Sequence, residues 1–338
     1  MRSLRSNRWL PVALIGLTVS ACDVMSPSDP GALVPKTVME DASIPAIEMN
    51  GSRFHVQTMG DSTKPVIVFL HGGPGGDYRS MLRLAERYGG RSLADDYFLV
   101  FWDQRGSGLS ERMAKGTLTI DRYVADLDAL LDRYSAGRKA YLVGLSWGGM
   151  FATKYINERP QRVAGAVLIE PGPLDGVTME RLKGDIQDFR IGSELVNDIA
   201  WNGQFLSPDD HARMDFERML GVRDGQSKFH LSRTDPEPAW RLGAFASRYI
   251  MEDAQDGHGK FNFDFTTKLA AYTTPVLIVA GSRSDVLGPS LQEKQVRRFP
   301  HASLQVVNGV GHDVAWVRAP EVLALVESYL DARQGGVR

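Results

Sequence analysis

Cysteine is almost absent from this chain, with one residue among 338. A single cysteine excludes an internal disulfide and any metal site built from several thiolates. The sequence also lacks a Cys/His cluster with zinc spacing and the calcium-binding loop of an EF-hand. We therefore expect no metal and no other cofactor.

The chain also lacks a large excess of positive or negative charge. The chain has 39 basic and 41 acidic residues, which gives a formal net charge of −2. This balance gives no electrostatic reason to expect nucleic acid as a partner. Hydrophobic residues make up 43% of the chain and charged residues 24%, which excludes the disordered and fibrous classes. The length suits one large domain with an insertion, or two small domains.

The N-terminus has the architecture of a secretory signal. Three arginines lie within the first eight residues, and residues 9–21 are uncharged and mostly apolar. This run is too short to span a membrane comfortably. It ends in Val19-Ser20-Ala21-Cys22, which resembles the bacterial lipobox, where the signal is cut before a cysteine that then carries lipid. The alternative is a plain signal peptide with an incidental Cys22.

The lipobox predicts where the protein resides. Residues 1–22 are then a lipoprotein signal peptide that ends at Cys22, and the protein is exported to the bacterial cell envelope. Lipid on Cys22 would hold it to a membrane, on the periplasmic side. Residues 23–45 begin with a stretch rich in Pro, Ser and Asp, which predicts a tether between the anchor and the folded domain.

From residue 46 onward, strand and helix signals alternate. Continuous apolar runs are typical of strands buried on both faces, at 66–70, 98–102, 140–143, 163–169, 275–280 and, in shorter form, 304–307. Residues 53–59 alternate apolar and polar side chains, as a half-buried strand does. Helical periodicity occurs at 81–88, 120–134, 150–157, 291–299 and 320–333. This order predicts an α/β protein whose mostly parallel central sheet carries helices on both faces.

The alternation stops between residues 172 and 268. Helical patches occur at 178–189, 207–220 and 239–251, without a strongly apolar strand. We interpret 172–268 as a largely helical cap inserted into a core formed by 46–171 and 269–338.

The segment Gly144-Leu145-Ser146-Trp147-Gly148 matches the pattern of a nucleophile elbow. In this turn the serine sits between a strand and a helix, with its backbone strained and neighbouring chain segments close by. A side chain two positions before or after the serine would clash there. A predicted strand precedes Ser146 and a predicted helix follows it, which favours a catalytic serine over a chance match.

A glycine-rich loop, His71-Gly72-Gly73-Pro74-Gly75-Gly76, follows the predicted strand at 66–70. Glycines just past a strand allow backbone N–H groups to point toward a developing oxyanion. We assign this role to the Gly73 amide, together with the Trp147 amide. A plain tight turn is the alternative. A phosphate-binding loop is disfavoured because the Gly-x-x-x-x-Gly-Lys-Ser/Thr pattern is absent.

Asp285 and His312 complete a candidate catalytic triad. Each follows a predicted strand, and their order after Ser146 is Ser, Asp, His. Open parallel sheets collect their active sites at the carboxyl ends of the strands. A serine hydroxyl needs a base at neutral pH, and the histidine needs a carboxylate that fixes its tautomer and stabilises its cation.

Three sequence blocks together resemble the proline iminopeptidase branch of the α/β-hydrolases. They are HGGPG at 71–75, DQRGSGLS at 103–110 and GLSWGG at 144–149. The resemblance implies an α/β-hydrolase fold, a Ser146–Asp285–His312 triad and an oxyanion hole at Gly73 and Trp147. It also implies release of N-terminal residues, with proline as a candidate, through an acyl-enzyme and without a cofactor. We expect block 103–110 to be scaffolding, with Asp103 and Arg105 paired.

Peptidases of this kind hold the substrate's free amine with a carboxylate. Glu170 and Glu252 are the candidates for that role here. The expected partners are therefore small peptides, amides or esters, together with the membrane. Two alternatives stay open: a carboxylesterase or lactonase that uses the same triad, and a non-catalytic binding lipoprotein.

Overall fold

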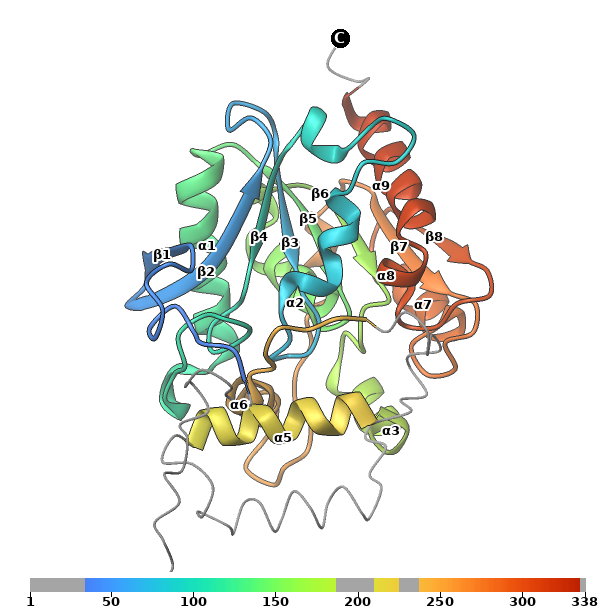
Figure 1. Cartoon of the computed structure of the whole chain (residues 1–338). Coiled ribbons are helices and arrows are strands. Elements are labelled where there is room, and N and C mark those ends of the chain that lie inside the picture. The colour runs from blue at the N-terminus through green and yellow to red at the C-terminus, as the bar shows by residue number, and fades with distance from the viewer. Residues whose placement is uncertain (1–33, 187–209, 225–236, 335–338) are drawn as a thin grey trace, which may run out of the picture.

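An eight-stranded sheet forms the centre of the protein (Figure 1). The computed structural model describes residues 34–186, 210–224 and 237–334. Within these ranges the strand order is β1-β2-β4-β3-β5-β6-β7-β8. The strands β1 and β4 both pair antiparallel with β2, and all other pairs are parallel. The strands are β1 (Ala46–Met49), β2 (Ser52–Met59), β3 (Val66–Leu70), β4 (Phe98–Trp102), β5 (Ala140–Leu145), β6 (Val163–Ile169), β7 (Val276–Gly281) and β8 (Ala302–Val307). The predicted sheet is confirmed.

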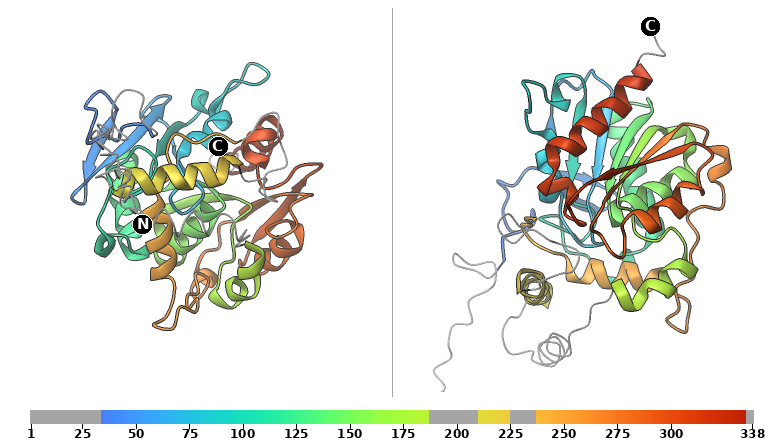
Figure 2. Two further views of the ribbon diagram at one scale, coloured as in Figure 1. Left: turned by 60° about the horizontal axis from the view of Figure 1, so that its bottom comes forward. Right: turned by 90° about the vertical axis from the view of Figure 1, so that its right-hand side faces the viewer.

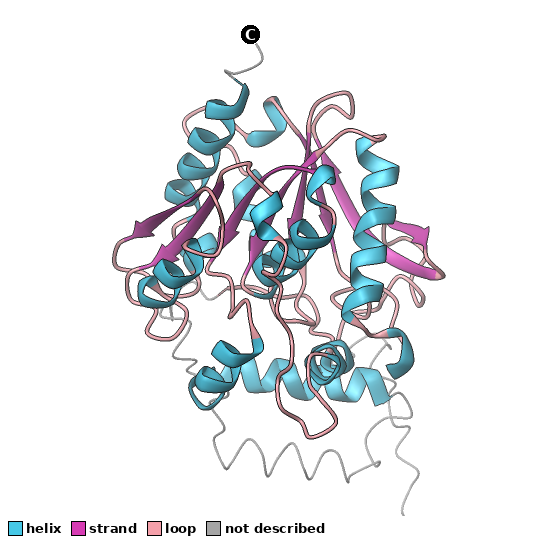
Figure 3. Cartoon of the chain, turned by 180° about the vertical axis from the view of Figure 1, so that it is seen from behind, coloured by secondary structure: helices cyan, strands magenta, loops and turns pink. Residues whose placement is uncertain are grey.

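Helices cover both faces of this sheet, as the sequence predicts (Figure 3). Side chains of β3 alternate between two hydrophobic clusters. Val66 and Val68 pack on one face with the apolar side chains of α1 and α2, whereas Ile67 and Phe69 pack on the other with those of η1 and α9. Outside the cap, the described helices longer than three residues are α1 (Ile120–Ser135), α2 (Trp147–Glu158), α7 (Pro289–Val296), α8 (Val314–Val317), α9 (Ala319–Gln334) and the 3₁₀ helix η1 (Tyr78–Ala85).

One of these helices differs from its prediction. The α-helical periodicity at 81–88 corresponds to η1, which is a 3₁₀ helix and begins three residues earlier. The Asp77 side chain accepts a hydrogen bond from the Arg79 N–H and so starts the helix there. At its end, the Glu86 N–H bonds to the Arg83 carbonyl, with the i→i+3 spacing of a 3₁₀ turn.

Three described α-helices lie between β6 and β7 in the chain and form one layer beyond the sheet (Figures 1 and 2). They are α3 (Gly176–Ile186), α5 (Asp210–Asp224) and α6 (Ala244–Asp253). They correspond to the three predicted helical patches of the cap. Parts of those patches, at 187–189 and 207–209, lie outside the described residues, whereas residues 239–243 are described and precede α6 without being helical.

The described part of the predicted tether packs against the core. The Val38 side chain is fully buried, and its N–H donates to the Leu109 carbonyl at 2.9 Å. A guanidinium N–H of Arg241 donates to the Pro35 carbonyl at 2.8 Å. This differs from a free tether over 23–45, because Val34 and Val38 are buried and the backbone here bonds to the core at Leu109 and to the cap at Arg241. No helix in the described part of the chain is long and apolar enough to cross a bilayer.

Candidate active site

Ser146 sits on a strained turn between β5 and α2. Its φ of 54° and ψ of −115° lie in a region that side chains rarely adopt. A Cβ atom at Gly144 would lie 2.4 Å from the Gly148 carbonyl oxygen, and one at Gly148 would lie 1.8 Å from the Leu70 carbonyl oxygen. Both positions therefore require glycine, for the steric reason that the elbow pattern predicts.

His312 is hydrogen-bonded to Glu170. The ring nitrogen Nδ1 of His312 lies 2.7 Å from Glu170 Oε2. Glu170 is fully buried and directly follows β6, with a φ of 41°. Its second oxygen, Oε1, accepts the Gly281 N–H at 2.5 Å. The carboxylate is thus fixed by two bonds and holds the histidine ring in one orientation.

The same edge of the sheet gathers the nucleophile and the Glu170–His312 pair. The Ser146 N–H donates to the carbonyl of Ile169, the residue before Glu170, at 2.9 Å. The Glu170 N–H in turn donates to the Val279 carbonyl of β7 at 2.8 Å. Adjacent parallel strands therefore bring Ser146, Glu170 and the loop of His312 to their carboxyl ends, where such sheets place active sites.

Glu170 also sets the pKa of His312. Burial alone would lower the pKa of this imidazole, because it disfavours the charged form. The hydrogen bond to Glu170 and the charge of that carboxylate outweigh burial, so the pKa of His312 is raised above its ordinary value. Glu237 and Asp313 raise it further through their charges. The site therefore stabilises the imidazolium that forms when the histidine accepts a proton.

The structure does not bring Asp285 to His312. Asp285 is exposed in a turn after β7, and among the described residues no hydrogen bond or ion pair joins it to the histidine. Nδ1 carries one proton to donate, and Glu170 accepts it. Sequence reasoning placed the partner of His312 after β7, whereas the carboxylate that bonds to His312 in the structure follows β6. The available signal was a carboxylate directly after an apolar strand next to the nucleophile strand.

Neither glutamate proposed for amine binding is placed for that role. Glu170 is engaged with His312. Glu252, on α6, forms an ion pair with Lys115 at 2.6 Å, and its side chain is 48% exposed. Glu237, which sequence reasoning missed, lies in the cap segment before α6 and acts electrostatically on His312. A single glutamate without a surrounding motif gave no signal in the sequence.

Gln104 joins the glycine-rich loop to the nucleophile helix. Its backbone N–H donates to His71 Nε2 at 2.9 Å, and its side-chain amide donates to the His71 carbonyl at 3.1 Å. The amide oxygen accepts from Trp147 Nε1 at 3.0 Å. His71 Nδ1 lies 2.8 Å from the Gly72 carbonyl, so the ring donates there as a neutral imidazole, and burial lowers its pKa. These bonds fix the loop relative to α2.

The loop backbone runs beside the nucleophile. A Cβ atom at Gly72 would lie 3.4 Å from the Cβ of Ser146. The next residue, Gly73, has a φ of 123°, which favours glycine. The oxyanion role of the Gly73 and Trp147 amides stays a prediction, and the close approach of this loop to Ser146 is compatible with it.

Block 103–110 is built differently from the expected pairing of its two charged residues. Asp103 Oδ2 accepts from His55 Nδ1 at 2.8 Å, whereas Arg105 forms a two-pronged ion pair with Asp126 at 2.7 and 2.8 Å. All four side chains are buried. Each charge has its own partner, so the expected pair between Asp103 and Arg105 is wrong.

Among the described residues, no group of acidic, histidine or cysteine side chains could hold a metal ion.

Comparisons with known proteins agree with this geometry. The family model described as alpha/beta hydrolase fold matches residues 65–319. A proline iminopeptidase from Heyndrickxia coagulans is 27% identical over 307 residues, which cover 85% of this chain and 98% of that protein. A proline iminopeptidase from Mycobacterium smegmatis has a similar fold, with 18% sequence identity, a TM-score of 0.60 and coverage of 87% of this chain and 99% of that chain. Est816, described as an N-acyl homoserine lactone degrading enzyme, also has a similar fold, with 20% sequence identity, a TM-score of 0.57 and coverage of 84% of this chain and 99% of that chain. The chain belongs to the α/β-hydrolase fold family and is a hydrolase.

Proposed function

We propose that this protein is a serine hydrolase in which Ser146 is the nucleophile, His312 the base and Glu170 the carboxylate that orients the base. One observation carries the proposal: the 2.7 Å bond between His312 and Glu170 at the same sheet edge as a strained, glycine-flanked serine. A buried histidine paired with a carboxylate in this setting has the features of a general base.

In the proposed reaction, Ser146 Oγ attacks the substrate carbonyl carbon while His312 takes the hydroxyl proton. The Gly73 and Trp147 amides stabilise the oxyanion of the tetrahedral intermediate. His312 then gives its proton to the leaving group, which departs as the acyl-enzyme forms. Water, activated by the same histidine, hydrolyses this ester and restores Ser146. Throughout, Glu170 stabilises the imidazolium without itself becoming protonated.

For the substrate, we propose peptides with a free N-terminus, from which the enzyme releases the first residue, with proline as a candidate. The support is the similarity to a proline iminopeptidase along 85% of the chain. A substrate ammonium group requires a carboxylate partner in a covered pocket. Glu237 is the described cap carboxylate whose charge acts on His312, and we propose it for this role. The alternative is an ester or lactone substrate, which the fold shared with Est816 favours.

Substitutions of the two carboxylates should separate Glu170 from Asp285. Glu170→Gln should lower kcat/KM by about 10²- to 10⁴-fold, because the amide no longer stabilises the imidazolium. Asp285→Asn should keep kcat/KM within about threefold of the wild type, in the range of surface substitutions away from the chemistry. Ser146→Ala removes the nucleophile, so its activity sets the baseline against which the other variants are compared. It should also abolish labelling by a fluorophosphonate probe.

The pH profile provides a second readout for the same variants. His312 must be neutral to act as a base, so activity falls as the pH drops through its raised pKa. Glu170→Gln removes the main cause of that rise and should move the acid limb of kcat/KM to lower pH. Asp285→Asn should leave the limb in place. A large loss in Asp285→Asn, with Glu170→Gln close to the wild type, would reverse the assignment.

Substrate choice is tested by blocking the amine. An aminoacyl-arylamide with a free N-terminus should be cleaved at least about 100-fold faster than its N-acetylated form, because a charge-assisted contact of about 3 kcal/mol is lost. Glu237→Gln should shrink this ratio, whereas Glu252→Gln, at the exposed pair with Lys115, is the matched control and should not. Equal rates on both amides, with faster turnover of p-nitrophenyl esters or lactones, would support the alternative substrate class.

We further propose that the protein is an exported lipoprotein, held by lipid on Cys22 to a membrane of the bacterial cell envelope, on its periplasmic side. The support is the basic start, the apolar run and the Val-Ser-Ala-Cys sequence. Cys22→Ser should prevent lipidation, because the thioether requires sulfur, and the variant should appear as soluble or unprocessed protein. Mass spectrometry and detergent phase separation of the wild type decide the question. Wild-type protein that partitions into the aqueous phase and has no added lipid mass would contradict the anchor.

A further inference from the structure

The cap segment just before α6 is hydrogen-bonded to the glycine-rich loop beside Ser146. The Gly243 N–H donates to the Gly75 carbonyl at 2.7 Å. One turn into α6, the Ser247 N–H donates to the Gly243 carbonyl at 3.0 Å. The start of this cap helix is therefore attached directly to the loop that we propose supplies an oxyanion donor.

Three glycines from separate segments meet at this contact. A Cβ atom at Gly75 would lie 2.3 Å from the Gly243 carbonyl oxygen, and one at Gly243 would lie 2.1 Å from the Gly106 carbonyl oxygen. Real Cβ atoms do not approach backbone that closely, so the three backbones touch only because side chains are missing. Gly243 has a φ of −80°, which any residue can adopt, so its requirement for glycine is one of space alone.

Asp77 makes a second connection between the same two segments. One of its oxygens, Oδ2, accepts the N–H groups of Trp240 and Arg241 at 2.5 and 3.1 Å, while Oδ1 accepts that of Arg79 at 3.0 Å. Burial, and then the charge of Asp103, raise the pKa of Asp77 to about 8, against the effect of these N–H donors. The cap backbone thus supplies two of the three N–H groups that bond to this buried side chain.

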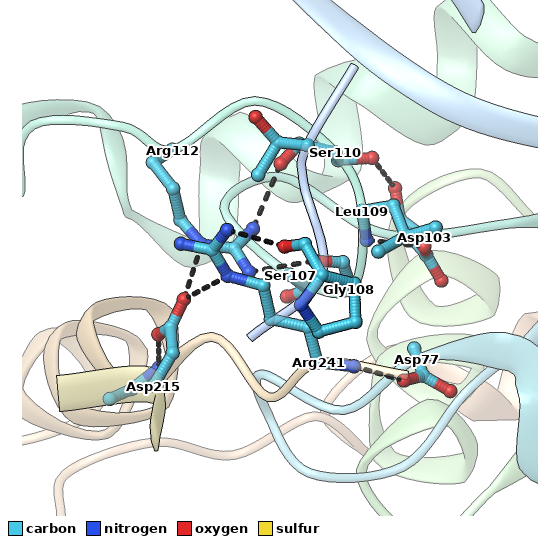
Figure 4. Close-up of polar contacts among 12 residues, drawn as sticks. Asp77, Asp103, Ser107, Gly108, Leu109, Ser110, Arg112, Asp215 and Arg241 are labelled. Carbon is cyan, nitrogen blue, oxygen red and sulfur yellow. Dashed lines mark hydrogen bonds and ion pairs between the residues drawn. The ribbon is translucent and has the colours of Figure 1, made fainter. Parts of the chain in front are cut away.

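The contact continues into cap helix α5 through a buried ion-pair cluster (Figure 4). The Asp215 carboxylate, on α5, accepts from Arg241 Nε at 2.7 Å and from Arg112 Nε at 2.8 Å. Its other oxygen accepts the Ala244 N–H at the start of α6 at 2.8 Å. Arg112 in turn donates to the Gly108 carbonyl at 2.7 Å. Movement of the described cap helices would therefore disturb Arg241, and through it the backbone that Asp77 holds.

We propose that Asp77 and Gly243 are positioning residues that make the geometry of the oxyanion loop depend on the seating of the cap. The proposal rests on the serine-hydrolase function above. It implies that the cap acts on the rate of the chemical step as well as on substrate binding. The cap is seated when the Gly243 N–H bonds to the Gly75 carbonyl, and only then is the backbone donor beside Ser146 in place. Substrates that hold the cap in this position are therefore selected through kcat.

Gly243→Ala inserts one methyl group into the junction. It should lower kcat per active site by about 10- to 100-fold, less than the roughly 10²- to 10³-fold for complete loss of an oxyanion donor, with KM within about threefold of the wild type. The matched control is Gly257→Ala, in the loop that follows α6, where a Cβ atom meets nothing within 4 Å. It should behave as the wild type. Active sites are counted by the end point of fluorophosphonate labelling, so misfolded protein does not enter kcat.

Asp77→Asn tests the second connection with a side chain of the same size. The amide oxygen can accept N–H bonds but the amide nitrogen cannot, so kcat per labelled site should fall in the same direction. This variant decides the proposal if Gly243→Ala does not fold. A purely structural role would reduce the labelled fraction or the melting temperature and leave kcat per labelled site unchanged.

The outcomes separate this inference from the proposed function. Wild-type protein that is not labelled by the fluorophosphonate would contradict the serine-hydrolase function itself. Labelled wild type together with a Gly243→Ala or Asp77→Asn variant whose KM rises at constant kcat would overturn the inference, because the cap would then affect binding alone.

Discussion

The hydrogen bond between His312 and Glu170 is the constraint on which the proposed chemistry depends. Glu170 is held at the end of β6 by its backbone N–H on β7 and by the Gly281 N–H on its side chain. A buried carboxylate is unfavourable unless it is hydrogen-bonded and paired, and here it is both. The arrangement orients the imidazole ring and stabilises its cation, which are the two properties that a base for a serine requires.

Close backbone approach is the means by which this site is assembled. At Gly281 a Cβ atom would lie 2.4 Å from the Gly311 carbonyl oxygen, so the loop of His312 reaches Glu170 only because residue 281 has no side chain. Gly144 and Gly148 do the same for the elbow, and Gly243 for the cap. The glycines therefore act through the space that they leave, at positions where strand ends, loops and cap converge.

Most of the fold could be predicted from the sequence because it depends on local patterns. Buried parallel strands appear as apolar runs, and the elbow appears as two glycines around Ser146. The partner of His312 could not be settled in this way. Asp285 and Glu170 each follow an apolar strand, and which of them faces His312 depends on the path of two loops. Sequence order alone agrees with either one, since both lie between Ser146 and His312.

The pairing of the buried charged residues could not be predicted from the sequence either. Asp103 and Arg105 are near neighbours in the chain, yet each pairs with a distant residue, His55 and Asp126. Asp215 and Arg241 are 26 positions apart and meet only when α5 and α6 pack together. Pairings of this kind follow from tertiary packing, and no local period in the sequence records them.

In the proposed triad, the proton on His312 Nδ1 is bonded to Glu170. Proton NMR of the purified enzyme at a pH where His312 is charged observes that proton directly, because a charge-assisted N–H···O⁻ bond shifts its resonance far downfield. We expect a downfield signal in the wild type and in Asp285→Asn, and none in Glu170→Gln. A signal that persists in Glu170→Gln and disappears in Asp285→Asn would contradict it.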